Sequence, residues 1–143
     1  MDTILIIALV ASVVSILYGV LLAVMVLKKS SGDQKMQAIQ QAIETGAKAY
    51  LKRQNTTVAV VGVIIAAVLA YFLPATVVYG FILGALASAL AGYLGMSISV
   101  KANARVAEEA KYGIPRAFAL GFRGGAVTGF MVVGLALLSL TLF

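Results

Sequence analysis

Long apolar stretches separated by two polar segments make up the whole chain. Apolar side chains fill almost every position at about residues 3–27, 56–73, 77–100 and 117–143, and the last unbroken apolar run begins at Gly124. The hydrocarbon core of a bilayer is about 30 Å thick, so a helix needs about 20 apolar residues to cross it. The pattern therefore predicts four transmembrane helices.

The polar segments, residues 28–55 and 101–116, predict extensions of these helices beyond the bilayer. Apolar side chains recur every three or four positions between residues 34 and 50, which is the period of an amphipathic helix. Because no helix breaker occurs between Gln34 and Leu73, we expect one helix to continue into the second span until Pro74. The third span is likewise expected to continue past residue 100 as far as Gly113.

Charge placement predicts the orientation of the spans. All eleven Lys and Arg residues fall between Lys28 and Arg53 or between Lys101 and Arg123. The positive-inside rule therefore assigns both polar segments to the cytoplasm and both termini to the outside. The predicted fold is an all-α membrane protein, residues 1–143, with four transmembrane helices in antiparallel up-down order and extensions into the cytoplasm.

Composition excludes an ordinary soluble domain, because 62% of the residues are hydrophobic, 11% are charged and the mean hydropathy is +1.06. The net charge of +6 follows from the orientation, so no nucleic-acid partner is expected. The chain has no Cys for a disulfide or thiolate site and no His, the commonest proton carrier. The first stretch is too long for a secretory signal and lacks a basic start.

Small residues recur every four positions in the third and fourth spans. Such a ridge lets another helix backbone approach closely, so we expect these residues to pack helices. The alternative is that they line a path for an ion or a lipid. The candidate packing residues are Gly80, Gly84, Ser88, Gly92, Gly121, Gly125 and Gly129.

Five basic residues are expected at the level of the lipid headgroups. Lys52 and Arg53 precede the second span, which is short enough to need their side chains to reach back to the interface. Lys101 and Arg105 follow the third span, and Arg123 precedes the last apolar run. Arg123 could also serve a substrate or a partner carboxylate, although reaching out to the interface is the simpler account.

No catalytic, cofactor or metal residue is predicted from these residues alone. An ion path needs ionisable groups inside the bilayer, and the spans contain only Arg123, near the start of the fourth. A phosphate or Mg²⁺ site needs converging carboxylates or a Gly-rich loop with a Lys. Glu108 and Glu109 could hold a metal, but adjacent helical residues point in different directions, which favours local salt bridges.

Three segments give the chain a family resemblance. They are "ETGAKAYLKRQ" at residues 44–54, "GYLGMSISVKANARVAEEA" at residues 92–110 and "AFALGFRGGAVTGF" at residues 117–130. Their order and spacing resemble the N-terminal four spans of the membrane-bound, ion-translocating inorganic pyrophosphatases. The resemblance covers essentially all of the chain.

The resemblance implies a larger enzyme than these four spans. Family members form homodimers, hydrolyse pyrophosphate as its Mg²⁺ complex on the cytoplasmic side, and pump H⁺ or Na⁺ outward. Their acidic catalytic motifs lie on later, inner helices, so no catalytic residue is assigned here and Mg²⁺ is expected only for the complete enzyme. The implied role of this segment is an outer-layer helix scaffold, whose partners are the lipid bilayer, the remaining helices and a second copy.

Two other hypotheses stay open at this point. The chain could be an independent small four-helix membrane protein with a structural or oligomeric subunit role. It could also be an unrelated four-helix transporter, which the scarcity of charge within the spans argues against. The stop at Phe143, directly after an apolar span, favours a truncated pump.

Overall fold

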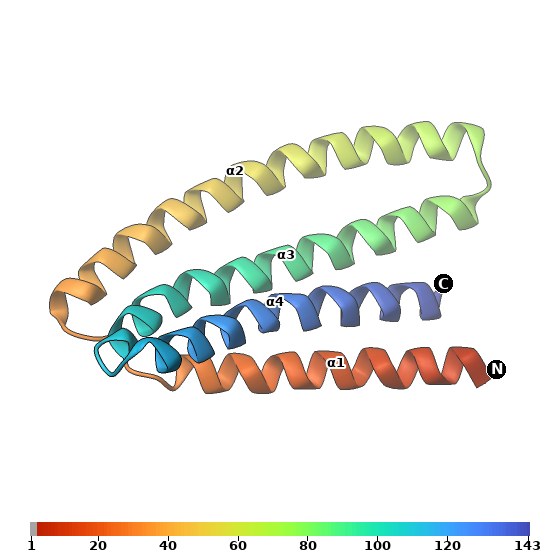
Figure 1. Ribbon diagram of the computed structural model, residues 1–143. Coiled ribbons are helices and arrows are strands. Elements are labelled where there is room, and N and C mark those ends of the chain that lie inside the picture. Colours follow the sequence, from red (N-terminus) through yellow and green to blue (C-terminus); the bar gives the residue numbers. More distant parts are fainter. Residues whose placement is uncertain (1–2) are drawn as a thin grey trace.

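Four helices form the computed structural model, which describes residues 3–143. They are α1 (Thr3–Leu27), α2 (Gln34–Phe72), α3 (Ala75–Ala110) and α4 (Ile114–Leu142) (Figure 1). Each is long and apolar enough to cross a membrane. The prediction of an all-α membrane protein with four spanning helices is confirmed.

The long α2 and α3 helices confirm that the polar segments continue the spans. Asp33 caps the start of α2, since its Oδ1 accepts a hydrogen bond from the Met36 N–H at 3.0 Å. At the other end, Leu73 is extended because the following Pro74 disfavours helical backbone before it. Gly113 separates α3 from α4 with φ of +117°, a conformation that side chains other than glycine rarely adopt.

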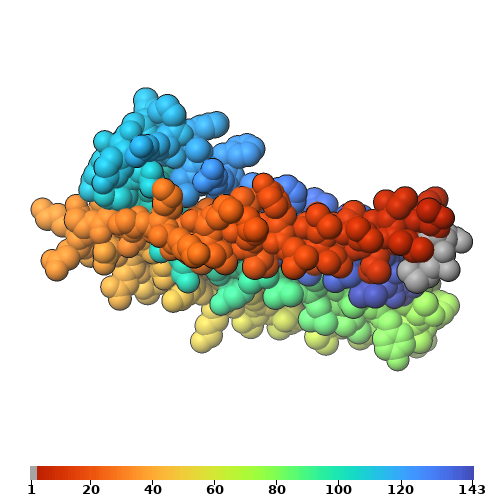
Figure 2. All heavy atoms as spheres, turned by 90° about the horizontal axis from the view of Figure 1, so that it is seen from below, coloured from red at the N-terminus to blue at the C-terminus, as the bar shows by residue number. Residues whose placement is uncertain are grey.

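The helices lie side by side in the spatial order α2, α3, α4, α1. Helix α3 packs against both α2 and α4, while α1 packs mainly against α4 and makes no contact with α2, its neighbour in sequence. Both charged turns gather at one end of the bundle, and the Pro74 connection lies at the other (Figure 1). From below, α1 lies along one face of the bundle, and the turn after it and the start of α2 extend beyond its end (Figure 2). The position of α1 in the bundle therefore depends on its packing against α4.

The buried core is small and lies where α1, α3 and α4 meet. One cluster contains Leu22, Val127 and Met131, and a second, nearer the charged turns, contains Val26, Ala102 and Leu120. Helix α2 has no buried residue. Large apolar side chains are exposed on all four helices, as expected where lipid or further helices cover the surface.

Candidate functional site

The turn after α1 is held against the charged end of α3. Arg105 on α3 donates from Nη2 to the Leu27 carbonyl oxygen at 3.4 Å, and its Nη1 donates to the Lys101 carbonyl oxygen at 2.7 Å. A cation at the carboxyl end of a helix is favourable, because unpaired carbonyl groups accumulate negative charge there. Lys29 adds an ion pair to Glu109, with Nζ 2.9 Å from Oε1.

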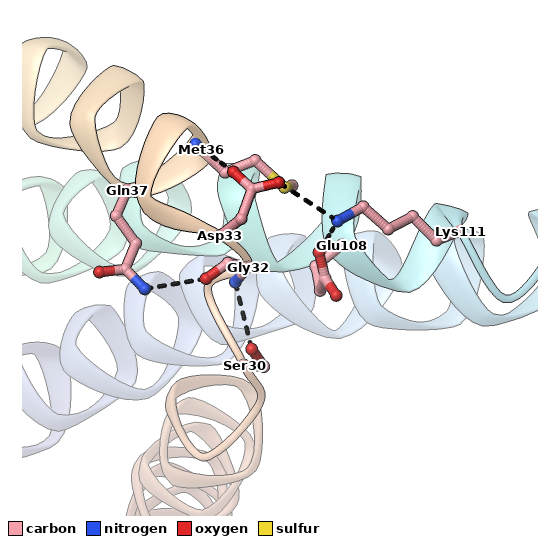
Figure 3. A network of polar contacts seen from close by, with 7 residues as sticks. All are labelled: Ser30, Gly32, Asp33, Met36, Gln37, Glu108 and Lys111. Carbon is pink, nitrogen blue, oxygen red and sulfur yellow. Dashed lines mark hydrogen bonds and ion pairs between the residues drawn. The ribbon is translucent and has the colours of Figure 1, made fainter.

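A second network joins the start of α2 to the end of α3 (Figure 3). The Lys111 Nζ lies 2.6 Å from Glu108 Oε2 and 3.7 Å from Asp33 Oδ2. The turn is closed by Gln37, whose side-chain amide donates to the Gly32 carbonyl oxygen at 2.8 Å. The local salt bridge expected from the sequence is confirmed for Glu108, which pairs with Lys111 three residues later, whereas Glu109 pairs with the distant Lys29.

Hydrogen bonds and charges shift two pKa values in this network. The hydrogen bond from the Met36 N–H lowers the pKa of Asp33 below its ordinary value of 3.8, and the charge of Lys111 lowers it further. The hydrogen bond to Glu108 raises the pKa of Lys111 above its ordinary value of 10.5, helped by the negative charges of Glu108 and Asp33. The network is therefore fully charged at neutral pH.

We expect acid to loosen this network. Because the folded-state pKa of Asp33 is depressed, its stabilising effect is present above pH 3.8 and disappears as the pH falls through the lower folded value. The contribution of Lys111 is present below pH 10.5 and disappears as the pH rises through the raised folded value. Thermal unfolding in detergent can be followed by circular dichroism from about pH 2 to about pH 7, and the unfolding midpoint should fall at low pH.

The control for this prediction is Asp33→Asn, which keeps an oxygen acceptor for the Met36 N–H but removes the titrating charge. Its unfolding midpoint should change less across the acid range than that of the unmodified chain. An identical acid response in both proteins would show that Asp33 does not contribute to it.

The five predicted boundary residues lie on three helices. Lys52 and Arg53 are exposed on α2, and Lys101 and Arg105 are half-buried on α3. Lys101 lines a groove between α2 and α3, and Arg123 is exposed on α4. Their level relative to the lipid headgroups stays a prediction.

The predicted ridge on α3 lies in the floor of an apolar groove. Gly80, Gly84, Ser88 and Gly92 line this groove of ≈ 780 Å³. Its walls include Leu69 of α2, the chain-terminal Phe143 and four residues of α4: Val132, Ala136, Ser139 and Leu140. Among residues 3–143, no atom outside the local helix lies within 4 Å of a Cβ placed at Gly84 or Gly92. At Gly80 such a Cβ would lie 2.8 Å from the Phe143 ring. Most of the ridge is therefore open.

The predicted ridge on α4 is open as well. A Cβ at Gly121 would meet only the Val106 side chain, at 3.8 Å, which is ordinary contact. At Gly125 and Gly129 the described part of the chain places nothing within 4 Å. The expected role of these residues in helix packing stays a prediction.

Four other glycines make close contacts between helices, and the sequence analysis did not select them. A Cβ at Gly95 would lie 2.6 Å from Thr128 Cγ2, and one at Gly134 would lie 2.6 Å from Ile16 Cγ1. The corresponding distances are 3.1 Å between Gly124 and the Ala102 Cβ, and 3.3 Å between Gly19 and the Met131 methyl group. These glycines set the spacing of α1, α3 and α4.

The described side chains form helix interfaces, an apolar groove and a charged end of the bundle. Within residues 3–143, no three Asp, Glu, His or Cys residues are placed to hold a metal ion. The geometry instead offers an apolar groove with a small-residue floor and a charged end that ties three helices together. Together with four helices that are long and apolar enough to cross a membrane, these features define a multi-pass membrane domain.

Known proteins place this domain in a family. The family described as "Inorganic H+ pyrophosphatase" matches residues 13–143. A K(+)-insensitive pyrophosphate-energized proton pump of Methanosarcina mazei is 46% identical over 130 residues, which cover 90% of this chain and 19% of that protein. The chain belongs to the inorganic H⁺ pyrophosphatase family.

Other relatives differ in the ion that their names give. A proton pump of Pyrobaculum aerophilum is 43% identical over 135 residues, with 90% of this chain and 19% of that protein covered. A putative K(+)-stimulated pyrophosphate-energized sodium pump of Clostridium tetani is 36% identical over 129 residues, with the same two shares. This chain thus spans about a fifth of the length of these curated relatives.

Proposed function

We propose that this chain is the N-terminal helix scaffold of a membrane pyrophosphatase that couples pyrophosphate hydrolysis to H⁺ or Na⁺ translocation. Its own work is to pack around the remaining helices of the pump, which carry the catalytic groups. The complete enzyme uses Mg²⁺ with pyrophosphate and forms a homodimer, and no residue of this chain is assigned to the Mg²⁺ site. The chain alone is not expected to be active.

The observation that carries this proposal is the open groove on α3. Its floor is made of small residues with nothing against Gly84 and Gly92 in residues 3–143, and its volume is ≈ 780 Å³. Without a hydrophobic driving force between helices, packing in a bilayer depends on such close approach of backbones. The groove therefore suits a further helix, which the remaining four fifths of the longer relatives would supply.

Complementation tests this proposal. The chain is produced with a second chain that supplies the remaining part of the Methanosarcina mazei relative, and Mg²⁺-dependent pyrophosphate hydrolysis is measured in isolated membranes. Each chain alone should be inactive, whereas the pair should hydrolyse pyrophosphate. The matched control pairs the relative's own N-terminal segment with the same second chain, which establishes that the split enzyme can assemble.

Activity of this chain alone would contradict the scaffold role. If the control pair is active and the pair with this chain is not, the alternative role as an independent structural subunit gains support. Its oligomeric state in detergent, measured by light scattering, then becomes the informative quantity.

For orientation, we propose that the helices cross the bilayer in up-down order with both charged turns in the cytoplasm. Because the chain has no Cys, single substitutions give an unambiguous label. In intact cells, a membrane-impermeant maleimide should label Thr76→Cys, beside the Pro74 connection, and should not label Ala38→Cys on the polar part of α2. Both sites are exposed. After permeabilisation both should react, and the reverse pattern in intact cells would overturn this orientation.

A further inference from the structure

A small basic cavity lies where α1 ends and α4 begins. Lys29, Arg116 and Arg123 line it together with Glu109, and Ala119 and Leu120 complete the wall. Its volume is ≈ 210 Å³, far above the roughly 30 Å³ that one water occupies in the liquid. The cavity therefore has room for a polar group, and three of its four charged side chains are cationic.

Two of these cations have no acidic partner. Lys29 neutralises Glu109, since their Nζ and Oε1 atoms are 2.9 Å apart. Arg116 and Arg123 make no ion pair within residues 3–143, and the Arg116 guanidinium lies 5.8 Å from the centre of the Tyr112 ring. Within the cavity, positive charge thus exceeds negative charge.

The spacing of the two arginines places them on one side of α4. They are seven residues apart, which is about two helical turns and about 10 Å along the axis. A guanidinium group presents a planar set of N–H donors that matches the oxygens of a phosphate group. Two such groups and the nearby ammonium of Lys29 favour a phosphate-bearing anion over a carboxylate.

The position of the cavity indicates where such an anion comes from. Arg123 directly precedes the apolar run that begins at Gly124, and Leu120 in the cavity wall is only 3% exposed. The cavity is therefore located at the boundary between the charged turns and the apolar length of the bundle. Basic pockets between transmembrane helices at this level suit anionic lipid headgroups.

We propose that Lys29, Arg116 and Arg123 form a binding site for a phosphate group, with the phosphodiester of an anionic phospholipid as its source. Inorganic phosphate or pyrophosphate offers the same oxygens from solution, and the experiment below separates the two sources. This inference is independent of the scaffold role, because it concerns a different face of the bundle and requires no further helix.

Native mass spectrometry of the 143-residue chain tests the site. The chain is purified in an uncharged detergent and titrated with phosphatidylglycerol or phosphatidylcholine of identical acyl chains. We expect phosphatidylglycerol to bind about 25-fold more tightly, the combined effect of the two unpaired arginines. Arg116→Gln combined with Arg123→Gln should remove most of this preference, since each basic residue near an anionic lipid contributes about fivefold. Both side chains are exposed and lack ion pairs within residues 3–143, so little structural damage is expected.

The matched control is Lys52→Gln combined with Arg53→Gln, which removes the same charge from exposed positions of α2. These two residues are also expected at the headgroup level but do not line the cavity, so this variant should keep most of the lipid preference. Circular dichroism of both double variants checks that helix content is kept. Equal losses in the two double variants would overturn the site, because they would reflect a diffuse attraction between charges.

Inorganic phosphate and pyrophosphate form the second arm of the titration. If either binds to the unmodified chain, displaces phosphatidylglycerol and fails to bind the arginine double variant, the phosphate site is supported with a soluble source. No preference for phosphatidylglycerol and no binding of either soluble anion would overturn the proposal.

Discussion

Gly134→Leu should separate α1 from α4. A Cβ at position 134 would lie 2.6 Å from Ile16 Cγ1 and 3.1 Å from two backbone atoms of α1, the Ile16 nitrogen and the Ser12 carbonyl oxygen. Backbone atoms cannot move without displacing the helix, so overpacking here should cost about 3 kcal/mol, the upper part of the usual range. The contact lies in the interface that mainly holds α1, since this helix packs chiefly on α4.

Disulfide crosslinking gives a direct readout of this separation. A Cβ at Gly19 on α1 would lie 3.4 Å from the Phe130 Cβ on α4, which is close to the Cβ spacing of a disulfide, so Gly19→Cys combined with Phe130→Cys should crosslink in a chain that has no other Cys. Gly134→Leu should reduce the crosslinked fraction and lower the thermal midpoint in detergent.

Gly129→Leu is the matched control for this substitution. It adds the same side chain to the same helix, where no described atom lies within 4 Å of the new Cβ. Its crosslinking should stay close to that of the parent. Similar losses from both substitutions would mean that leucine disturbs α4 itself and that the close approach of α1 is not the cause.

Gly92→Leu should have little effect on the isolated chain and a large effect on a complemented pump. Position 92 lies in the open groove, and no described atom outside its local helix is within 4 Å of the added Cβ. If a helix of the pump occupies this groove, leucine blocks its approach, at a cost of about 1–3 kcal/mol for an overpacked contact. That cost would reduce assembly roughly five- to hundredfold at about 1.4 kcal/mol per factor of ten.

The complementation assay described above measures this loss as pyrophosphate hydrolysis. Gly92→Ala serves as the control, because a methyl group should be accommodated far better than an isobutyl group. The thermal midpoint of the isolated chain should be nearly unchanged by either substitution. Full activity of the Gly92→Leu pair would show that the groove does not receive a helix of the pump.

The sequence predicts the lengths of the helices better than it predicts which helices pack against each other. The lengths of α2 and α3 follow from a sustained period of three to four residues and from Pro74, because both signals are local. The pairing of α1 with α4 is not visible, since α1 is apolar on all sides and shows no preferred face. The ion pair between Lys29 and Glu109 is likewise not predictable, because no sequence pattern connects the turn after α1 with the end of α3.

The sequence also does not predict which glycines make the contacts between helices. The rule of small residues at every fourth position selects Gly121, Gly125 and Gly129, whereas α4 uses Gly124 and Gly134 for its contacts inside the bundle. Gly124 and Gly125 are adjacent, so they point about 100° apart around the helix. Which of the two faces meets α3 depends on side chains of another helix, such as Ala102, and a single helix sequence does not contain that information.

The pairing of α1 with α4 also has a consequence for biosynthesis. Helix α1 leaves the ribosome first, yet its main partner is complete only at Leu142. At a synthesis rate of about 5–20 residues per second, α1 waits on the order of ten seconds before α4 is finished. During this interval the hairpin of α2 and α3 can already form, and α1 has only its small contact with α3, which includes the hydrogen bond from Arg105 to the Leu27 carbonyl oxygen. Of these four helices, α1 is thus made first, but most of its contacts form only after α4 is complete.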